Sequence, residues 1–446
     1  MPNLQAPRVG GARLLGLFSA VTSAMQPARL PAALLAVLFV SALVPVVDLA
    51  GGKSYGARGF AGASMGESER EIAYERARSA AVRVAGDAAS ALGERPSLGE
   101  LASAVRAATQ RATADASPDD ERRLRQRAVE AIEVIESARM RGVATVFLEG
   151  ERSALRQTID AILRAEPAKA IDALLGAVFT LPAAAIREAP LAMPLAHLLV
   201  LCASSLIAGA LARMAAVHAG RTSRLGALEG AGYARACALN LVSLPVLPAV
   251  VIGLLGAVVA AFAALLSVPV LNIVAAALLV VPLLVALLAA VLALVAIAAF
   301  PLMPAAVAIE DCDAGDAITR AGALVLTRPV LWLGTLATAV LVLALGGMLV
   351  HGALGLASAG MGALLEGLAG DAGRALASGE SAEIAALFGP DRIVGLVGSF
   401  WIGLFKALGG AYCFSLACDL AARAYLFMRE RIDGEDASTM AGFGIR

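Results

Sequence analysis

The sequence contains few charged residues and distributes them unevenly. Charged residues make up 16% of the 446 residues and hydrophobic residues 59%, whereas about 25% of residues are charged in an ordinary soluble domain. No Asp, Glu, Lys or Arg occurs between Arg235 and Glu310, a stretch too long for the buried helices of a soluble core. This lack of charge excludes a soluble globular protein and predicts several membrane-spanning helices.

Groups that carry chemistry are scarce as well. The chain has three His and five Cys, and the nearest cysteine pair, Cys413 and Cys418, lacks the spacing of a zinc site or redox motif. We therefore expect no disulfide framework, no metal and no cofactor. No Ser-His-Asp or Cys-His arrangement can be assembled on one side of the membrane, so we predict no enzymatic activity. A formal net charge of zero gives no reason to expect nucleic acid as a partner.

The first apolar run, "LPAALLAVLFVSALVPVV", extends from Leu30 to Val47. A cleaved signal peptide is the alternative interpretation, but Asp48 occupies a position where a cleavage site needs a small residue, so we expect residues 29–50 to be a membrane anchor. Residues 1–28 carry Arg8 and Arg13 and no acidic residue. They predict a cytoplasmic segment with a short amphipathic helix at the membrane interface.

Residues 51–170 are polar and carry acidic and basic side chains interspersed along the chain, as on solvated helix faces. Ser97 followed by Glu100 fits a helix capping box, and Ser117-Pro118 marks another helix start. We expect an extracytoplasmic helical domain here.

Five further apolar runs are long enough to cross a membrane. They occupy approximately residues 192–212, 246–267, 273–300, 330–351 and 394–422. The run at 171–186 is too short to span and is interrupted by Pro182, so we expect it to be interfacial or re-entrant. The predicted fold is therefore all-α: a polytopic transmembrane helix bundle of about six spans with an extramembrane α-helical insert. Residues 171–428 would hold the interfacial segment and the five-span bundle, and 429–446 a cytoplasmic tail.

The arginines favour one orientation of these spans. With the N-terminus inside, the inner segments carry Arg8, Arg13, Arg29, Arg213, Arg221, Arg224, Arg235, Arg320, Arg328, Arg423, Arg429 and Arg431. The short outer segments carry only Arg187, Arg374 and Arg392. Because short inner loops are enriched in Lys and Arg, we expect a multi-pass protein of the bacterial cytoplasmic (inner) membrane with both termini in the cytoplasm.

The last apolar run is unusually long. From Ile393 to Met428 a continuous helix would measure about 54 Å at 1.5 Å per residue, whereas the hydrocarbon core is about 30 Å thick. One end must project, or the helix must break, most naturally at Gly409-Gly410. Small residues recur at every fourth position: Gly395, Ser399, Gly403, Ala407, Ala411 and Ser415. This ladder predicts close packing against another helix; a substrate path is the alternative.

Four residues are candidates for an intramembrane polar site: Lys406, Asp419, Arg423 and His197. Asp419 and Arg423 have the i, i+4 spacing of an ion pair. Lys406 has no acidic residue in another predicted span to pair with, and a lysine at mid-bilayer costs about 2.5–3.5 kcal/mol. Either it forms a functional ion or anion site, or it reaches the interface along a tilted helix. His197 either hydrogen-bonds to a neighbouring helix or relays protons.

Three segments carry a resemblance to a known family. They are "GALARMAAVHAGR" (209–221), "PAAVAIEDCDAGDAITRAGALVLTRPVLWL" (304–333) and "YCFSLACDLAARAYLFMRERIDGED" (412–436). They resemble a family of bacterial multi-pass membrane proteins with a divergent polar insert after the first span. The resemblance implies the bundle architecture and brings no activity.

Two functional classes remain open from the sequence. The charge-balanced insert and the lack of catalytic groupings favour a structural or interaction protein of the scaffold type, which contacts the lipid bilayer and a membrane or periplasmic partner protein. The alternative is a transporter or lipid-handling membrane component that uses the last span. Lys406, the length of that span and two similar cytoplasmic connections, after the second and fourth spans, favour it.

Overall fold

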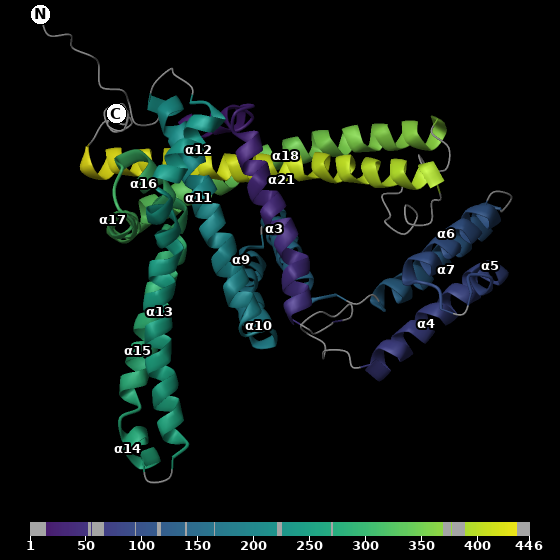
Figure 1. Cartoon of the computed structure of the whole chain (residues 1–446), viewed down its shortest axis with the longest axis horizontal. Coiled ribbons are helices and arrows are strands. Elements are labelled where there is room, and N and C mark those ends of the chain that lie inside the picture. Colours follow the sequence, from purple (N-terminus) through teal and green to yellow (C-terminus); the bar gives the residue numbers. More distant parts are fainter. Residues whose placement is uncertain are drawn as a thin grey trace, which may run out of the picture. The chain divides into compact units, whose positions relative to one another are not determined.

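The computed structural model shows a helical protein (Figure 1). It describes residues 15–51, 55, 67–93, 95–113, 117–138, 141–164, 166–220, 225–268, 271–368, 376 and 389–434. Within these ranges the chain forms helices and no strand, apart from one isolated bridge between Tyr55 and Arg141. The all-α prediction is confirmed. Arg8, Arg13, Arg221, Arg224, Arg374 and the tail beyond residue 434 lie outside the described residues.

Six helical segments of the described chain are long and apolar enough to cross a membrane. They lie in α3 (Leu30–Gly51), α11 (Ala192–Gly220), α13 (Ala238–Leu266), α15 with α16 (Val280–Ala299 and Met303–Glu310), α18 (Pro329–Leu368) and α21 (Gly389–Asp433). All six correspond to predicted spans, and most extend past the apolar run. A helix that continues keeps its backbone hydrogen bonds satisfied where the chain leaves the apolar region.

The chain divides into two compact units. The first comprises Met1–Val40, Leu198–Gly355 and Phe405–Arg446, and the second Ser41–His197 and Leu356–Leu404. In the first unit, every residue of α16 from Met303 to Ile309 is buried. Around α16 pack residues of α11, α13, α17 (Ala314–Thr327) and α21. A helix that is apolar on all sides belongs at the centre of a bundle, and α16 forms the core of this unit.

Helices α13 and α15 form a hairpin in the first unit, with α14 (Leu271–Ala277) between them (Figure 1). In the most apolar 18-residue stretch of α13 no residue is buried, and in that of the span that contains α15 only 6% of the residues are buried. Leu254, Leu283 and Leu287 are each at least 60% exposed. Surfaces this apolar suit contact with lipid chains, so the hairpin supports a membrane location for this unit.

The second unit contains a three-helix bundle made of α4 (Glu67–Ala85), α6 (Leu98–Thr113) and α7 (Pro118–Ser137), with the short α5 (Asp87–Ser90) between α4 and α6. Its core consists mainly of alanines, which let the helices approach closely. The predicted capping box is present: Ser97 N donates to Glu100 Oε2 at 2.6 Å, and Glu100 N to Ser97 Oγ at 3.2 Å. Pro118 begins α7 as predicted.

The second unit also contains α8 (Val143–Leu163), which packs against a following helical segment of three parts. These are α9 (Pro167–Leu175), the π-helical turn η3 (Gly176–Thr180) and α10 (Leu181–Glu188). The run at 171–186 falls in this segment and is not among the candidate spans of the described chain. Pro182 lies in the first turn of α10, directly after the π-helical turn, and the helical segment continues through it.

The described part of the N-terminal segment differs from the single amphipathic helix expected. It forms a 3₁₀ turn, η1 (Leu15–Leu17), and a four-residue helix, α2 (Ala20–Ser23). Leu17 and Ala20 are buried in one cluster with Tyr412 of α21 and Val342 of α18. Its apolar residues thus pack on the protein, because the surfaces of α18 and α21 offer an apolar site within reach.

Candidate functional site

The main polar site of the first unit is a buried ion-pair cluster around Asp419 of α21. The carboxylate is fully buried and accepts from Arg29 Nη1 at 3.0 Å and from Arg423 Nε at 2.9 Å. The Ser23 hydroxyl also donates to it. The sequence prediction of an Asp419–Arg423 pair is confirmed, and the structure adds Arg29 and Ser23 to it. We call these four residues the Asp419 cluster.

Arg29 is nearly as buried as Asp419 itself. Its side chain is 1% exposed, and its second terminal nitrogen, Nη2, donates to the carbonyl oxygen of Met214 in α11 at 3.2 Å. The cluster therefore joins the start of α3 to both α11 and α21. Breaking a buried ion pair leaves an uncompensated charge that costs about 3–5 kcal/mol, so Asp419 fixes the arrangement of these helices.

Arg423 ties the N-terminal segment to α21. It donates to the Gly16 carbonyl oxygen at 3.2 Å and to Ser19 Oγ at 2.9 Å, besides its bond to Asp419. Ser415, one turn before Asp419, donates to the Ala24 carbonyl oxygen at 3.1 Å. These bonds satisfy backbone carbonyls of a segment that has little regular helix of its own. The role of this site is structural, because both carboxylate oxygens of Asp419 and both terminal nitrogens of Arg29 are used within the protein.

Lys406 belongs to the first unit and His197 to the second, and neither is a member of the Asp419 cluster. Lys406 is exposed and has no hydrogen bond or ion pair with any described residue. His197 belongs to the second unit, where Nδ1 contacts the Met193 carbonyl oxygen of its own helix at 2.8 Å. Its ring packs edge to face against Phe147 of α8, with the two ring centroids 4.8 Å apart. Of the four predicted candidates, the structure brings together Asp419 and Arg423 only.

The small-residue ladder of α21 contributes only in part to helix packing. Ala411 and Ser415 are buried, but a Cβ added at Gly403 would meet nothing within 4 Å. The close approach to α18 occurs at Gly409, where a Cβ would lie 2.9 Å from Nε2 of His351. Gly409-Gly410 therefore does not break α21, which runs without interruption from Gly389 to Asp433. Gly409 admits α18, and Gly410 faces α3, where an added Cβ would lie 3.5 Å from a methyl carbon of Val37.

A second polar cluster surrounds the C-terminal end of α16. Arg213 of α11, 3% exposed, donates to the Ala308 carbonyl oxygen at 2.8 Å. Tyr233 of α12 (Ala227–Ala236) donates to the Val307 carbonyl oxygen at 2.8 Å. The last carbonyls of a helix lack regular helical partners. Here Arg213 supplies the donor to Ala308, and the Val307 oxygen accepts from Tyr233 in addition to the Asp311 N–H at 2.9 Å.

Glu310, the last residue of α16, joins α16 to α17 and α21. Its carboxylate pairs with Arg320 of α17, accepts from the Tyr425 hydroxyl, and lies 2.8 Å from Arg429 Nε of α21. The glutamate side chain is 9% exposed. Charge-assisted bonds of this kind are the stronger hydrogen bonds in proteins, and we call this group the Glu310 cluster.

In the second unit an aspartate links the end of α3 to the start of α8, through hydrogen bonds instead of ion pairs. Asp48 Oδ1, at the end of α3, accepts from the backbone N–H groups of Ala144 at 2.7 Å and Thr145 at 3.2 Å. Its Oδ2 accepts from Thr145 Oγ1 at 2.6 Å. A carboxylate at this position caps the first turn of α8 and complements its dipole. Asp48, which argued against signal cleavage, is therefore the cap of a distant helix.

Two neighbours shape this capping contact. A Cβ at Gly142 would overlap the Asp48 carboxyl group, so only glycine leaves room for the cap. Tyr55 pairs with Arg141 through two backbone hydrogen bonds of 2.9 Å and donates its hydroxyl to Glu188 at 2.6 Å. Burial, with the nearby Glu188 carboxylate, raises the pKa of Tyr55, so its hydroxyl remains a donor at neutral pH.

Comparison with known proteins gives no match to a family model, a curated protein or a solved structure. The functional argument therefore rests on the residues of this chain. Within the described ranges no three His, Cys, Asp or Glu side chains come together as a metal site requires.

Sequence reasoning missed the residues that complete both clusters. Arg29 was counted only as an inner-loop charge, although an arginine directly before a span is placed to reach a buried acid. Glu310 and Arg429 gave no sequence signal of their own, because they are far apart along the chain.

Proposed function

We propose that this protein is a scaffold of the bacterial cytoplasmic membrane that presents its three-helix bundle to a partner protein outside the cytoplasm. The bundle closes its own core through buried alanines and leaves a charged surface. Asp419, Arg423 and Glu310 are engaged within the protein in the Asp419 and Glu310 clusters, whereas Lys406 is exposed. A display role needs a stable membrane-embedded part and an exposed domain. The two clusters support the first, and the three-helix bundle supports the second.

One surface feature carries the proposal. A hollow of about 770 Å³ lies on the bundle between α4 and α7, lined by Ile72, Val134, Ser79 and a charged rim. Ile72 is 52% exposed within it. The rim alternates in charge, with Glu71 and Glu75 beside Arg76 and Arg83. An exposed apolar anchor with a mixed-charge rim fits an amphipathic helix of a partner protein.

Purification of the full chain from native membranes tests this role. Ile72→Glu should remove a stoichiometric partner protein, because the charge would occupy the apolar floor of the hollow. Val82→Glu is the matched control: Val82 is 37% exposed on the same helix and does not line the hollow. Equal partner recovery from the two variants would contradict the proposal. A retained small molecule or lipid without a protein partner, lost in Lys406→Met, would favour the transport alternative.

The proposed orientation has its own test. In a cysteine-free chain, Ser90→Cys in α5 and Thr319→Cys in α17 place single exposed thiols on the bundle and on a predicted cytoplasmic helix. A membrane-impermeant maleimide added to spheroplasts should label Ser90→Cys at once and Thr319→Cys only after lysis. The reverse pattern would place the bundle in the cytoplasm.

A further inference from the structure

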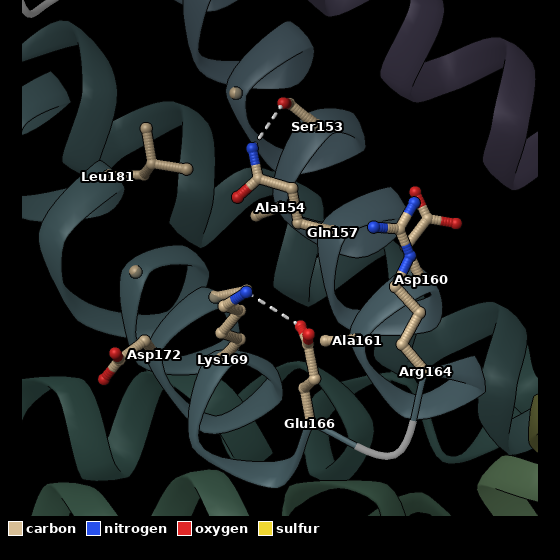
Figure 2. A pocket seen from close by; sticks show the side chains of 13 residues that line it. Ser153, Ala154, Gln157, Asp160, Ala161, Arg164, Glu166, Lys169, Asp172 and Leu181 are labelled. Carbon is tan, nitrogen blue, oxygen red and sulfur yellow. Dashed lines mark hydrogen bonds and ion pairs between the residues drawn. The ribbon is translucent and has the colours of Figure 1, made fainter.

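The hollow between α8 and the segment α9–η3–α10 has a composition unlike the rest of the second unit. It measures about 690 Å³, and its inner surface is made of small or apolar residues: Gly150, Ala154, Ala161, Ala173, Gly176 and Leu181 (Figure 2). Gly150 is constrained, because a Cβ there would lie 2.8 Å from a methyl carbon of Leu181. The space exists because facing helices place small side chains opposite one another.

Charged groups of both signs surround this space. The cations are Arg164 and Lys169, and the anions are Asp160, Glu166 and Asp172. Figure 2 shows the charged ends of Arg164 and Asp160 on one side and Asp172 on the other. Lys169 pairs with Glu166 at 2.9 Å, but their side chains are 73% and 40% exposed. Exposed pairs contribute little stability, so this pair can open to accept a ligand at small cost.

The helix that carries these groups has an apolar opposite face. Lys169, Asp172 and Gly176 recur at helical spacing toward the hollow, while Ile171, Leu174 and Phe179 are between 45% and 56% exposed. A short helix with one charged face and one such apolar face is suited to the boundary between head groups and acyl chains. The hollow therefore lies on the polar side of a helix built for the membrane interface.

The π-helical turn adds a second local feature. Residues Gly176–Thr180 form five consecutive π-helical residues, and Gly176 lines the hollow. π-Helical segments are rare and occur frequently at functional sites. Here the wider turn lies where α9 passes into α10, beside the space between these helices and α8.

We propose that this hollow binds a phosphoethanolamine group, with Lys169 and Arg164 on the phosphate and Asp172, on the opposite side, on the ammonium. A polyanion would meet three carboxylates and a polycation two basic groups, whereas a zwitterion satisfies both signs. A primary ammonium also donates three hydrogen bonds to carboxylate acceptors. The source of the group is phosphatidylethanolamine or a soluble phosphoethanolamine.

The first experiment uses the full chain in vesicles of equal parts phosphatidylethanolamine and phosphatidylglycerol, followed by extraction and native mass spectrometry of the retained lipid. The wild type should retain phosphatidylethanolamine in preference to phosphatidylglycerol. Lys169→Gln should lower that retention about tenfold, the loss of one charge-assisted contact. Arg152→Gln, an exposed α8 arginine that does not line the hollow, should leave it unchanged. Circular dichroism checks that all variants remain folded.

Two further arms complete the test. Soluble phosphoethanolamine that displaces the retained lipid would identify the head group alone as the ligand, whereas retention unaffected by it would identify the lipid. Asp172→Asn should reduce the preference for phosphatidylethanolamine over phosphatidylcholine, whose ammonium cannot donate hydrogen bonds. Equal retention by Lys169→Gln and Arg152→Gln, or no preference over phosphatidylglycerol in the wild type, would overturn the site. Neither result depends on Ile72, so this site and the scaffold role fail independently.

Discussion

Asp419 in the first unit and Asp48 in the second each join segments that are far apart in the sequence. Asp419 is fully buried between two arginines, so its charge is balanced by other charges. Asp48 is partly exposed and accepts two backbone N–H groups and one hydroxyl at the start of α8. One contact depends on charge compensation where water is excluded, and the other on the unsatisfied donors of a helix end. The two should therefore respond differently to substitution.

The largest effect is expected at Asp419. Asp419→Ala would leave Arg29 buried without its counter-charge and should destabilise the first unit by about 3–5 kcal/mol. Trp332 is 5% exposed in the core of that unit, so its fluorescence in a Trp401→Phe background can follow unfolding in mixed micelles.

The control for this change is Asp316→Ala. Asp316 is 59% exposed and lies 3.6 Å from Arg320, so its loss should cost less than about 1 kcal/mol. The double variant Arg29→Met, Asp419→Leu should recover most of the stability, because it removes both buried charges. If Asp419→Ala and Asp316→Ala were equally stable, the ion-pair cluster would have no structural role.

Next in size is Gly142→Ala in the second unit. The new methyl group would overlap the Asp48 carboxyl group and should cost about 1–3 kcal/mol, as overpacking does. Hydrogen exchange at the amides of Ala144 and Thr145 should speed up, because the displaced carboxylate no longer accepts from them. Unchanged protection at both amides would show that the cap tolerates a side chain at position 142.

Asp48→Ala should have a smaller effect, about 1 kcal/mol, the usual cost of losing a helix cap. The same two amides should lose protection, while Trp332 fluorescence reports an unchanged first unit. In the Asp48→Ala background Gly142→Ala should cost less than it does alone, because the carboxyl group is gone and only Cβ of residue 48, 2.4 Å from the added methyl carbon, still overlaps it. If the double variant lost as much stability as the two single variants together, the requirement for Gly142 would be independent of the helix cap.

Lys406→Met should have the smallest effect on folding. Lys406 is on the same helix as Asp419, yet it is exposed and has no partner among the described residues, so the change should stay within about 0.5 kcal/mol. The same fluorescence assay measures it. A loss of stability comparable to that of Asp419→Ala would contradict this expectation, because it would mean that Lys406 also has a partner in the folded protein.

Composition and local patterns alone predict the membrane class, the six spans and two helix starts of the insert, those of α6 and α7. Charge-free runs of sufficient length have few alternatives to a spanning helix, and capping signals such as Ser97 with Glu100 act within one turn. The Asp419–Arg423 pair was also predictable, because both residues lie one turn apart on a single helix. Such features are local, so the sequence carries them without knowledge of the fold.

The partner of each charged side chain depends on how the helices pack in three dimensions. Asp419 and Lys406 look similar within the same apolar run, and only the position of Arg29 beside α21 made one a buried ion-pair centre. The partners of Asp48, and Tyr425 and Arg429 among those of Glu310, come from segments about a hundred residues away in the chain, so packing brings them together. Charge compensation depends on separations of a few ångströms in space, and sequence order does not fix those separations.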